Sequence, residues 1–255
     1  METDMTVGSP ARVILNFTIP IFIGNIFQQL YNMADAVIVG KFVGPNALAA
    51  VGSCGTLMFL IIGFLQGLTA GFTVITAQHF GAGNMKAMRQ SVASACILSA
   101  VVSVIMTVLS MSMMKQILGW MNTPPEIYSE AYGYIMVICA GIVAQVLYNL
   151  LASILRALGN SKVPLYFLIL AAFLNVVLDL VFIIVFHMGA AGAAYATVIS
   201  QGVSGAACLL YIFKSVPDLH LNKEDWRLHR DLSMWQLRSG LPTALQYSLT
   251  ATGTI

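Results

Sequence analysis

Charge is what this sequence has least of. Only 9% of its 255 residues are Asp, Glu, Lys or Arg, whereas a soluble domain carries roughly 25%. Hydrophobic residues make up 58% of the chain. A chain with so few charges cannot cover a water-facing surface, so a soluble globular protein is excluded and an integral membrane protein is predicted.

Cysteines and recognised catalytic motifs are also scarce. The four cysteines lie inside apolar runs and form no close pair, so we expect small buried side chains rather than disulfides or metal ligands: Cys54, Cys96, Cys139 and Cys208. The chain has no P-loop and no His-Glu-x-x-His, Cys-x-x-Cys or Gly-x-Ser-x-Gly motif. We therefore expect no ATP-driven or enzymatic activity, no cofactor and no nucleic-acid partner.

Long apolar runs are abundant instead. A helix needs about 20 apolar residues to cross a bilayer. Six runs have this length and predict an all-α fold, a polytopic membrane bundle with six transmembrane helices: Ile14–Gly40, Ala47–Ala77, Ser91–Met114, Ala131–Leu155, Pro164–Phe186 and Gly189–Phe213. Short connections with turn residues, such as Gly44-Pro45-Asn46, separate most of them.

A polar stretch and a seventh apolar segment follow the six spans. Residues 214–236 are polar and mixed in charge, and they predict a linker between two lobes. The seventh segment, residues 237–255, begins with six residues that end in Pro242, as Leu15–Pro20 does in the first span. This restart predicts a repeat of six-helix halves. Residues 1–213 would form the N-terminal lobe, and the C-terminal lobe would be missing.

Basic residues are unevenly distributed between the two sides of the predicted bundle. Lys41 and Lys115 lie on one side, and the other ten Lys and Arg residues lie on the side of the N-terminus and the linker. Because basic loops stay on the cytoplasmic side, we expect a multi-pass protein of the inner cell membrane with a cytoplasmic N-terminus.

Two carboxylates fall inside the predicted spans, Asp35 and Asp179. A charge at the centre of a bilayer costs about 3 kcal/mol on insertion scales, and such residues are usually functional. Asn175 lies one helical turn before Asp179, on the same face. Counted from the span ends, Asp35 lies roughly 9 Å deep, and Asp179 and Thr197 roughly 12 Å deep. These side chains are predicted to share one layer.

This layer can be interpreted in two functional ways and one structural way. Carboxylate, amide and hydroxyl oxygens are ligands for a hard cation, which predicts a Na⁺ site at Asp35, Asn175, Asp179 and Thr197. Two neighbouring carboxylates can instead carry a proton. In the structural interpretation, each Asp only bonds to a neighbouring helix. Two acids at one depth favour the functional interpretations, and H⁺ and Na⁺ stay open.

Polar stripes on several spans indicate a wet interior. In the first span, amide side chains recur at helical spacing on the face of Asp35, and similar positions occur in the second, fourth and sixth spans. Together they predict a substrate cavity lined by Asn25, Gln28, Asn32, Gln66, Gln145, Asn149 and Gln201. By contrast, Gly63, Gly67 and Gly71 form a row of small residues that predicts close packing of another helix.

Several segments resemble the MATE family of multidrug and toxic-compound extrusion transporters: Tyr31-Asn-Met-Ala-Asp35, Gly44–Gly52, Gly81-Ala-Gly83, Arg156–Lys162 and Asn175–Asp179. The resemblance implies twelve helices in two lobes, with this chain as the N-terminal lobe, the linker and the start of helix seven. It also implies export of a substrate in exchange for H⁺ or Na⁺. Similarity to the DinF-like branch implies a coupling site at Tyr31, Asp35, Asn175, Asp179 and Thr197.

The leading hypothesis is therefore a secondary antiporter for drugs or organic cations. Its partners would be a cationic or amphipathic small molecule, membrane lipid and the missing lobe. One alternative is a flippase for lipid-linked precursors, which needs a basic cavity, and no Lys or Arg lies deep in a predicted span. A non-transporting membrane receptor is a second alternative, disfavoured by the cytoplasmic N-terminus.

Overall fold

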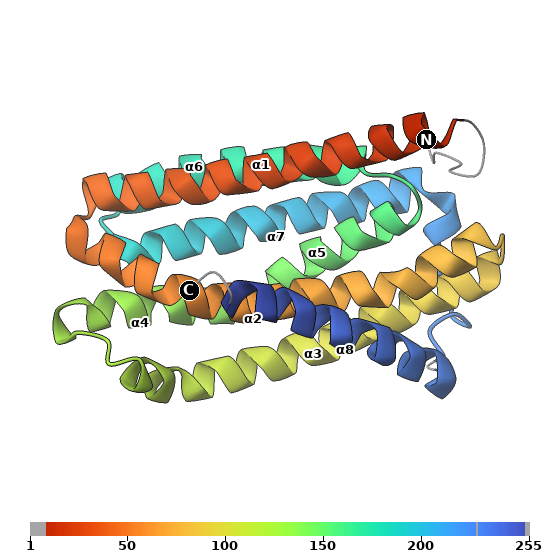
Figure 1. Ribbon diagram of the computed structural model, residues 1–255. Helices are drawn as coiled ribbons and strands as arrows, with labels where there is room; N and C mark the ends of the chain where they lie inside the picture. Colours follow the sequence, from red (N-terminus) through yellow and green to blue (C-terminus); the bar gives the residue numbers. More distant parts are fainter. Residues whose placement is uncertain (1–8, 228, 253–255) are drawn as a thin grey trace.

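The computed structural model describes residues 9–227 and 229–252, and all regular structure in these ranges is helical. This confirms the all-α class. Residues 1–8 of the predicted lobe and residues 253–255 of the predicted seventh segment lie outside the described ranges. The helices are α1 Pro10–Phe42, α2 Pro45–Gly81, α3 Met85–Trp120, α4 Pro125–Ala140, α5 Ile142–Ala157, α6 Lys162–Leu180, η1 Val181–Val185, α7 Gly189–Ser215, η2 Pro217–Leu219 and α8 Arg230–Thr252 (Figure 1).

The described helices supply the predicted spans with one exception. Helices α1, α2, α3, α7 and the continuous stretch Lys162–Val185 are each long and apolar enough to cross a membrane. The predicted fourth span, Ala131–Leu155, is not one straight helix. It is divided into α4 and α5, whose directions differ by 49°. Neither helix is long enough to cross a membrane alone, but the two together are.

The bend lies at Gly141, between α4 and α5. The side chain of Val198, from α7, fills the space that a Cβ atom on Gly141 would occupy. A residue with a side chain would therefore force α7 away from this point. The sequence did not predict the bend because its cause is a helix more than fifty residues further along the chain.

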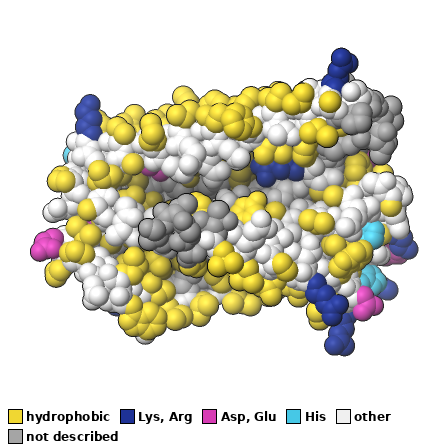
Figure 2. Space-filling view, in the orientation of Figure 1, with side chains coloured by type: hydrophobic (Ala, Val, Ile, Leu, Met, Phe, Trp, Pro, Cys, Tyr) yellow, Lys and Arg dark blue, Asp and Glu magenta, His cyan; other side chains and the backbone are white. Residues whose placement is uncertain are grey.

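The bundle consists of two groups of helices with α5 between them (Figure 1). Helix α6 packs against both α1 and α7, and α2 packs against α3, α4 and α5. Large apolar side chains such as Phe22, Val104 and Phe173 remain exposed on the outside, and apolar side chains cover much of the surface in Figure 2. An apolar exterior suits contact with lipid tails, which are as apolar as these side chains.

Helix α8 begins at Arg230, within the segment 214–236 that the sequence predicted as a linker and before the predicted start at Leu237. It packs along α2 more extensively than any other pair of described helices (Figure 1). The row of small residues predicted on α2 makes this contact. A Cβ atom on Gly67 would lie 2.7 Å from Ala244 Cα, and one on Gly71 would overlap Gly240 Cα.

Candidate functional site

A cavity of about 760 Å³ lies between the two groups of helices. Its lining residues come from α1, α2, α4, α5, α6, α7 and α8, the last through Tyr247. Along α1 it extends from Pro20 to Ala36, which is roughly 24 Å of helix. A hollow is visible near the centre of the face in Figure 2, with a basic side chain at its border. The volume is that of a site for a drug-sized molecule.

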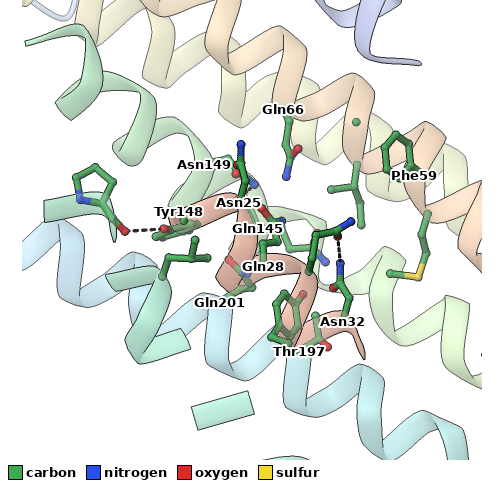
Figure 3. Close-up of a pocket in the computed structure, with 18 of the residues that line it drawn as sticks. Asn25, Gln28, Asn32, Phe59, Gln66, Gln145, Tyr148, Asn149, Thr197 and Gln201 are labelled. Carbon is green, nitrogen blue, oxygen red and sulfur yellow. Dashed lines mark hydrogen bonds between the residues drawn. The ribbon is translucent and has the colours of Figure 1, made fainter. Parts of the chain in front are cut away.

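The seven amide residues predicted from polar stripes all line this cavity: Asn25, Gln28, Asn32, Gln66, Gln145, Asn149 and Gln201. Figure 3 shows Gln66 of α2 and Asn149 of α5 directed towards the same space. Gln145 Nε2 and Gln201 Oε1 are buried and have no hydrogen-bond partner among the described residues. The cavity therefore offers both donors and acceptors to a bound molecule. That these residues bind a substrate stays a prediction.

The predicted coupling residues meet at one end of the cavity, where α1, α6 and α7 come together. The hydroxyl group of Thr197 donates to Asp35 Oδ2 at 3.4 Å and accepts from Asn175 Nδ2 at 3.3 Å. Asp35 is 9% exposed, and Asn175 and Asp179 are fully buried. The depths that we counted along the separate helices predicted that these side chains share one layer, and their contacts agree with this prediction.

The carboxyl group of Asp179 lies close enough to that of Asp35 for the two charges to interact. Four buried oxygen atoms in this cluster have no hydrogen-bond partner among the described residues: Asp35 Oδ1, Asp179 Oδ1, Asp179 Oδ2 and Asn175 Oδ1. Buried acceptors without donors are costly, and carboxylates so close together repel one another. A proton or a small hard cation would satisfy these atoms.

The described residues contain no group of three or more His, Cys, Asp or Glu side chains arranged to hold a metal ion. A Na⁺ site here would instead combine two carboxylates with the amide oxygen of Asn175 and the hydroxyl of Thr197. Na⁺ accepts such mixed oxygen ligands because it is a hard cation, like Ca²⁺ and Mg²⁺. The donor set therefore suits Na⁺ as well as a proton.

Two local features shape this end of the cavity. Tyr31, one turn before Asp35, lines the cavity near Thr197 and Gln201. Helix α6 changes to the π-helical turn η1 just after Asp179. π-Helical turns are rare and occur frequently at functional sites. The predicted span Pro164–Phe186 contains no signal for this change, because its apolar run is uninterrupted after Asp179.

The lining residues that the sequence analysis missed include Tyr134 and Arg156. Tyr134 of α4 is 5% exposed and lies near Asp35 and Tyr31. Arg156, in the last turn of α5, was counted only as a charge at the cytoplasmic edge. Both are eleven residues from Gln145, which is close to three helical turns. That spacing was the signal that could have placed them on the cavity side.

A family model described as MatE matches residues 20–181, which is more than half of the chain. The chain belongs to the MatE family. Members of this family are multi-pass membrane transporters and not enzymes. The match contains most of the helices that line the cavity, from Pro20 of α1 to the start of η1.

Individual relatives agree with the family match. The probable multidrug resistance protein YpnP of Bacillus subtilis is 31% identical over 252 residues, covering 98% of this chain and 56% of the relative. A solved MATE protein carrying a proline-to-alanine mutation is 29% identical with a TM-score of 0.90, covering 100% of this chain and 58% of that one. A MOP superfamily transporter from Pyrococcus furiosus is 30% identical with a TM-score of 0.88, covering 94% and 53%. The chain therefore spans little more than half the length of these relatives.

Proposed function

We propose that this chain is the N-terminal lobe of a secondary antiporter that exports amphipathic small molecules in exchange for H⁺ or Na⁺. In this proposal α1 to α7 form the lobe, the segment between α7 and α8 is the cytoplasmic linker, and α8 begins the second lobe. The N-terminus is cytoplasmic. The name of the Bacillus subtilis relative, a probable multidrug resistance protein, supports export of drug-like cargo.

The observation that carries the proposal is the pair of buried acids at one end of the cavity. Asp35 lines the cavity wall, while Asp179 lies behind it with two oxygen atoms that have no hydrogen-bond partner among the described residues. An ion that binds here would neutralise buried charge and also change the wall of the cargo cavity. The two events are coupled because they share Asp35, Tyr31 and Thr197.

Coupling then follows from differential binding to two states. Without the ion, the carboxylates repel each other, and the cavity favours a conformation in which Asp35 reaches water. With a proton or Na⁺ bound, α1 can pack more closely against α6 and α7, which narrows the cavity and releases the cargo. Coupling through acids of the first lobe is also our reason for proposing the DinF-like branch.

The test uses the complete protein in proteoliposomes, with a Na⁺ gradient and a pH gradient imposed separately. We expect efflux of an amphipathic cationic dye driven by one of the two gradients, which identifies the coupling ion. Asp35→Asn should abolish this efflux without lowering expression. Asp231→Asn is the matched control, because Asp231 is an exposed acid at the start of α8. Efflux at the wild-type rate in Asp35→Asn would rule out the coupling role.

The structure also gives one observation in favour of the alternative function, a flippase for lipid-linked precursors. Such a protein needs basic groups for a phosphate headgroup, and Arg156 lines the cavity. It is the only Lys or Arg among the residues that line this cavity, however, so the cavity is not strongly basic. Movement of a fluorescent lipid across the bilayer, without any effect of ion gradients on dye, would favour the flippase.

A further inference from the structure

The end of the cavity away from Asp35 carries a positively charged side chain. Arg156 lines this end, and its Nε atom is buried without a hydrogen-bond partner among the described residues. The one ion pair found in the described ranges joins Arg89 to Asp225 and does not involve Arg156. Asp35 is the single acidic residue that lines the cavity. Arg156 is therefore a cationic group inside the cavity, and no carboxylate among the described residues forms an ion pair with it.

Ser161 supports the same end from the next helix. It is 4% exposed and lines the cavity, and it occupies the N-cap position of α6 without making a side-chain cap hydrogen bond. Pro164, in the first turn of α6, also lines the cavity. The N-terminus of a helix carries partial positive charge, which favours anions; at α6 the backbone N–H of Val163 is already bonded to Asn160 Oδ1, and Pro164 has no N–H group. The hydroxyl of Ser161, which makes no cap hydrogen bond, thus lies at a helix end where an anion would be stabilised.

Hydroxyl groups complete this polar end. Tyr148 and Ser153 of α5 line the cavity close to Arg156 in sequence. The hydroxyl of Tyr148 donates to Pro164 O at 3.0 Å (Figure 3), which fixes α5 against the start of α6. This contact holds the middle of α5 and the first turn of α6 together. The arrangement is thus built by two helices rather than by one flexible side chain.

The two ends of the cavity are well separated. Ser161 and Asn175 lie near opposite ends of α6, roughly 21 Å apart along the helix. Gly24 of α1 packs against Leu165 and Leu168 in the first part of α6, whereas Asp35 bonds to Thr197 near the other end. The cavity therefore has an acidic end at Asp35 and a basic end at Arg156, with neutral amide side chains between them.

We propose that Arg156 and Ser161 form a subsite for an anionic group of the cargo, a carboxylate or a phosphate. This inference rests on the proposed transport function and specifies its substrate class: amphipathic molecules with an anionic group, zwitterions included, rather than purely cationic drugs. An arginine guanidinium binds carboxylate and phosphate through paired hydrogen bonds. The same chemistry fits a soluble cargo and the headgroup of an anionic lipid.

The test compares two rhodamine dyes that differ only in one group, a free carboxylate or its methyl ester. Binding is measured by fluorescence anisotropy with the complete protein in phosphatidylcholine nanodiscs. We expect wild-type protein to bind the acid more tightly than the ester. Arg156→Gln should raise the Kd of the acid about tenfold, because it removes charge-assisted hydrogen bonds, and should leave the Kd of the ester within about twofold.

Further variants separate the subsite from general charge effects. Arg156→Lys keeps the charge but loses the paired geometry, so it should recover part of the affinity for the acid. Ser161→Ala should raise the Kd of the acid by about threefold. Lys162→Gln is the matched control, because Lys162 is exposed and does not line the cavity. The subsite would be overturned if Arg156→Gln raised the Kd of both dyes equally. It would also be overturned if Lys162→Gln raised the Kd of the acid as much as Arg156→Gln does.

The source of the anionic group is decided by lipid composition. If phosphatidylglycerol in the nanodiscs raises the Kd of the acid for wild-type protein but not for Arg156→Gln, a lipid headgroup competes for Arg156. If it has no effect, the subsite belongs to soluble cargo.

Dye efflux from proteoliposomes separates the two proposals. Gradient-driven efflux of the ester, with acid binding independent of Arg156, would overturn the subsite and leave the transport function standing. Acid binding that depends on Arg156, with no gradient-driven efflux of either dye, would overturn the transport function and leave the subsite standing.

Discussion

The hydroxyl group of Thr197 donates a hydrogen bond to Asp35 at 3.4 Å. The same oxygen accepts a hydrogen bond from Asn175 at 3.3 Å. One side chain of α7 therefore links a carboxylate of α1 to an amide of α6, and it lies on the wall of the cavity. Any ion that changes the charge of Asp35 also changes the contact that holds α1 to α7.

Thr197→Val is expected to uncouple transport without unfolding the lobe. Valine has nearly the same shape, but it can neither donate to Asp35 nor accept from Asn175. A hydrogen bond to a charged group contributes about 1.5–3 kcal/mol, so we expect efflux to slow by about tenfold or more. The initial rate of gradient-driven dye efflux is the measurement. Thr197→Ser keeps the hydroxyl and should retain most of the rate; equal loss in both variants would contradict the hydrogen-bonding role.

Gly71→Ala is expected to separate α8 from α2. A Cβ atom at this position would overlap the backbone of Gly240, and backbone atoms cannot move aside as a flexible side chain can. Overpacking of this kind costs about 1–3 kcal/mol. Thermal unfolding in detergent should show the loss.

Gly52→Ala is the control for this change, because Gly52 lies in the same helix and has open space around its Cβ position. A thermal midpoint for Gly71→Ala equal to that of Gly52→Ala would show that α2 and α8 do not pack as described.

Gln236→Leu is expected to weaken the attachment of α8 to α3. Gln236 is fully buried, and its amide nitrogen donates to Ser91 O at 2.9 Å and to Ser91 Oγ at 3.1 Å. Leucine would remove these hydrogen bonds, which contribute about 0.5–1.5 kcal/mol each, while Ser91 Oγ would keep its hydrogen bond with Thr76. The free energy of unfolding is the measurement. Arg238→Gln, at an exposed position of α8, should be neutral, and a comparable loss there would contradict the assignment.

Glu130→Ala is expected to loosen the start of α7. Glu130 Oε2 accepts a hydrogen bond from the backbone N–H of Ala190 at 2.9 Å, next to Gly189, which has a positive φ of 62°. Loss of such a cap costs about 1 kcal/mol, which corresponds to roughly fivefold faster amide exchange. Hydrogen exchange of the first turn of α7 measures it.

Glu126→Ala is the control for Glu130→Ala. Glu126 is exposed in the first turn of α4, and its removal should leave the exchange of α7 unchanged. Unaltered exchange at Ala190 in Glu130→Ala would contradict the capping role.

The sequence predicted most of the helices and the contents of the acidic layer. The apolar runs are long because each must cross the hydrocarbon core, and the fixed rise of a helix converts position into depth. That is why Asp35, Asn175 and Thr197 could be assigned to one layer before any contact was seen. The seven amide residues of the cavity were found similarly, because polar side chains recur at helical spacing.

The directions and partners of the helices were not predictable in this way. No residue near Gly141 in the sequence indicates that Val198 approaches its backbone. The bend between α4 and α5 was therefore not predicted. The row of glycines on α2 predicted a close helix contact but not that α8 makes it. Arg156 lies one residue beyond its predicted span. Only the tertiary structure shows that it lines the cavity, next to the start of α6.

The sequence by itself thus determined which segments are long and apolar enough to cross a membrane and that Asp35, Asn175 and Thr197 lie at one level, because apolar length and the helical rise act within one segment. The tertiary structure alone decided which faces meet, how α4 and α5 bend, and that the cavity has a basic end as well as an acidic one. These features depend on packing between helices that are distant in sequence, where small side chains set the approach and the rotation of each helix.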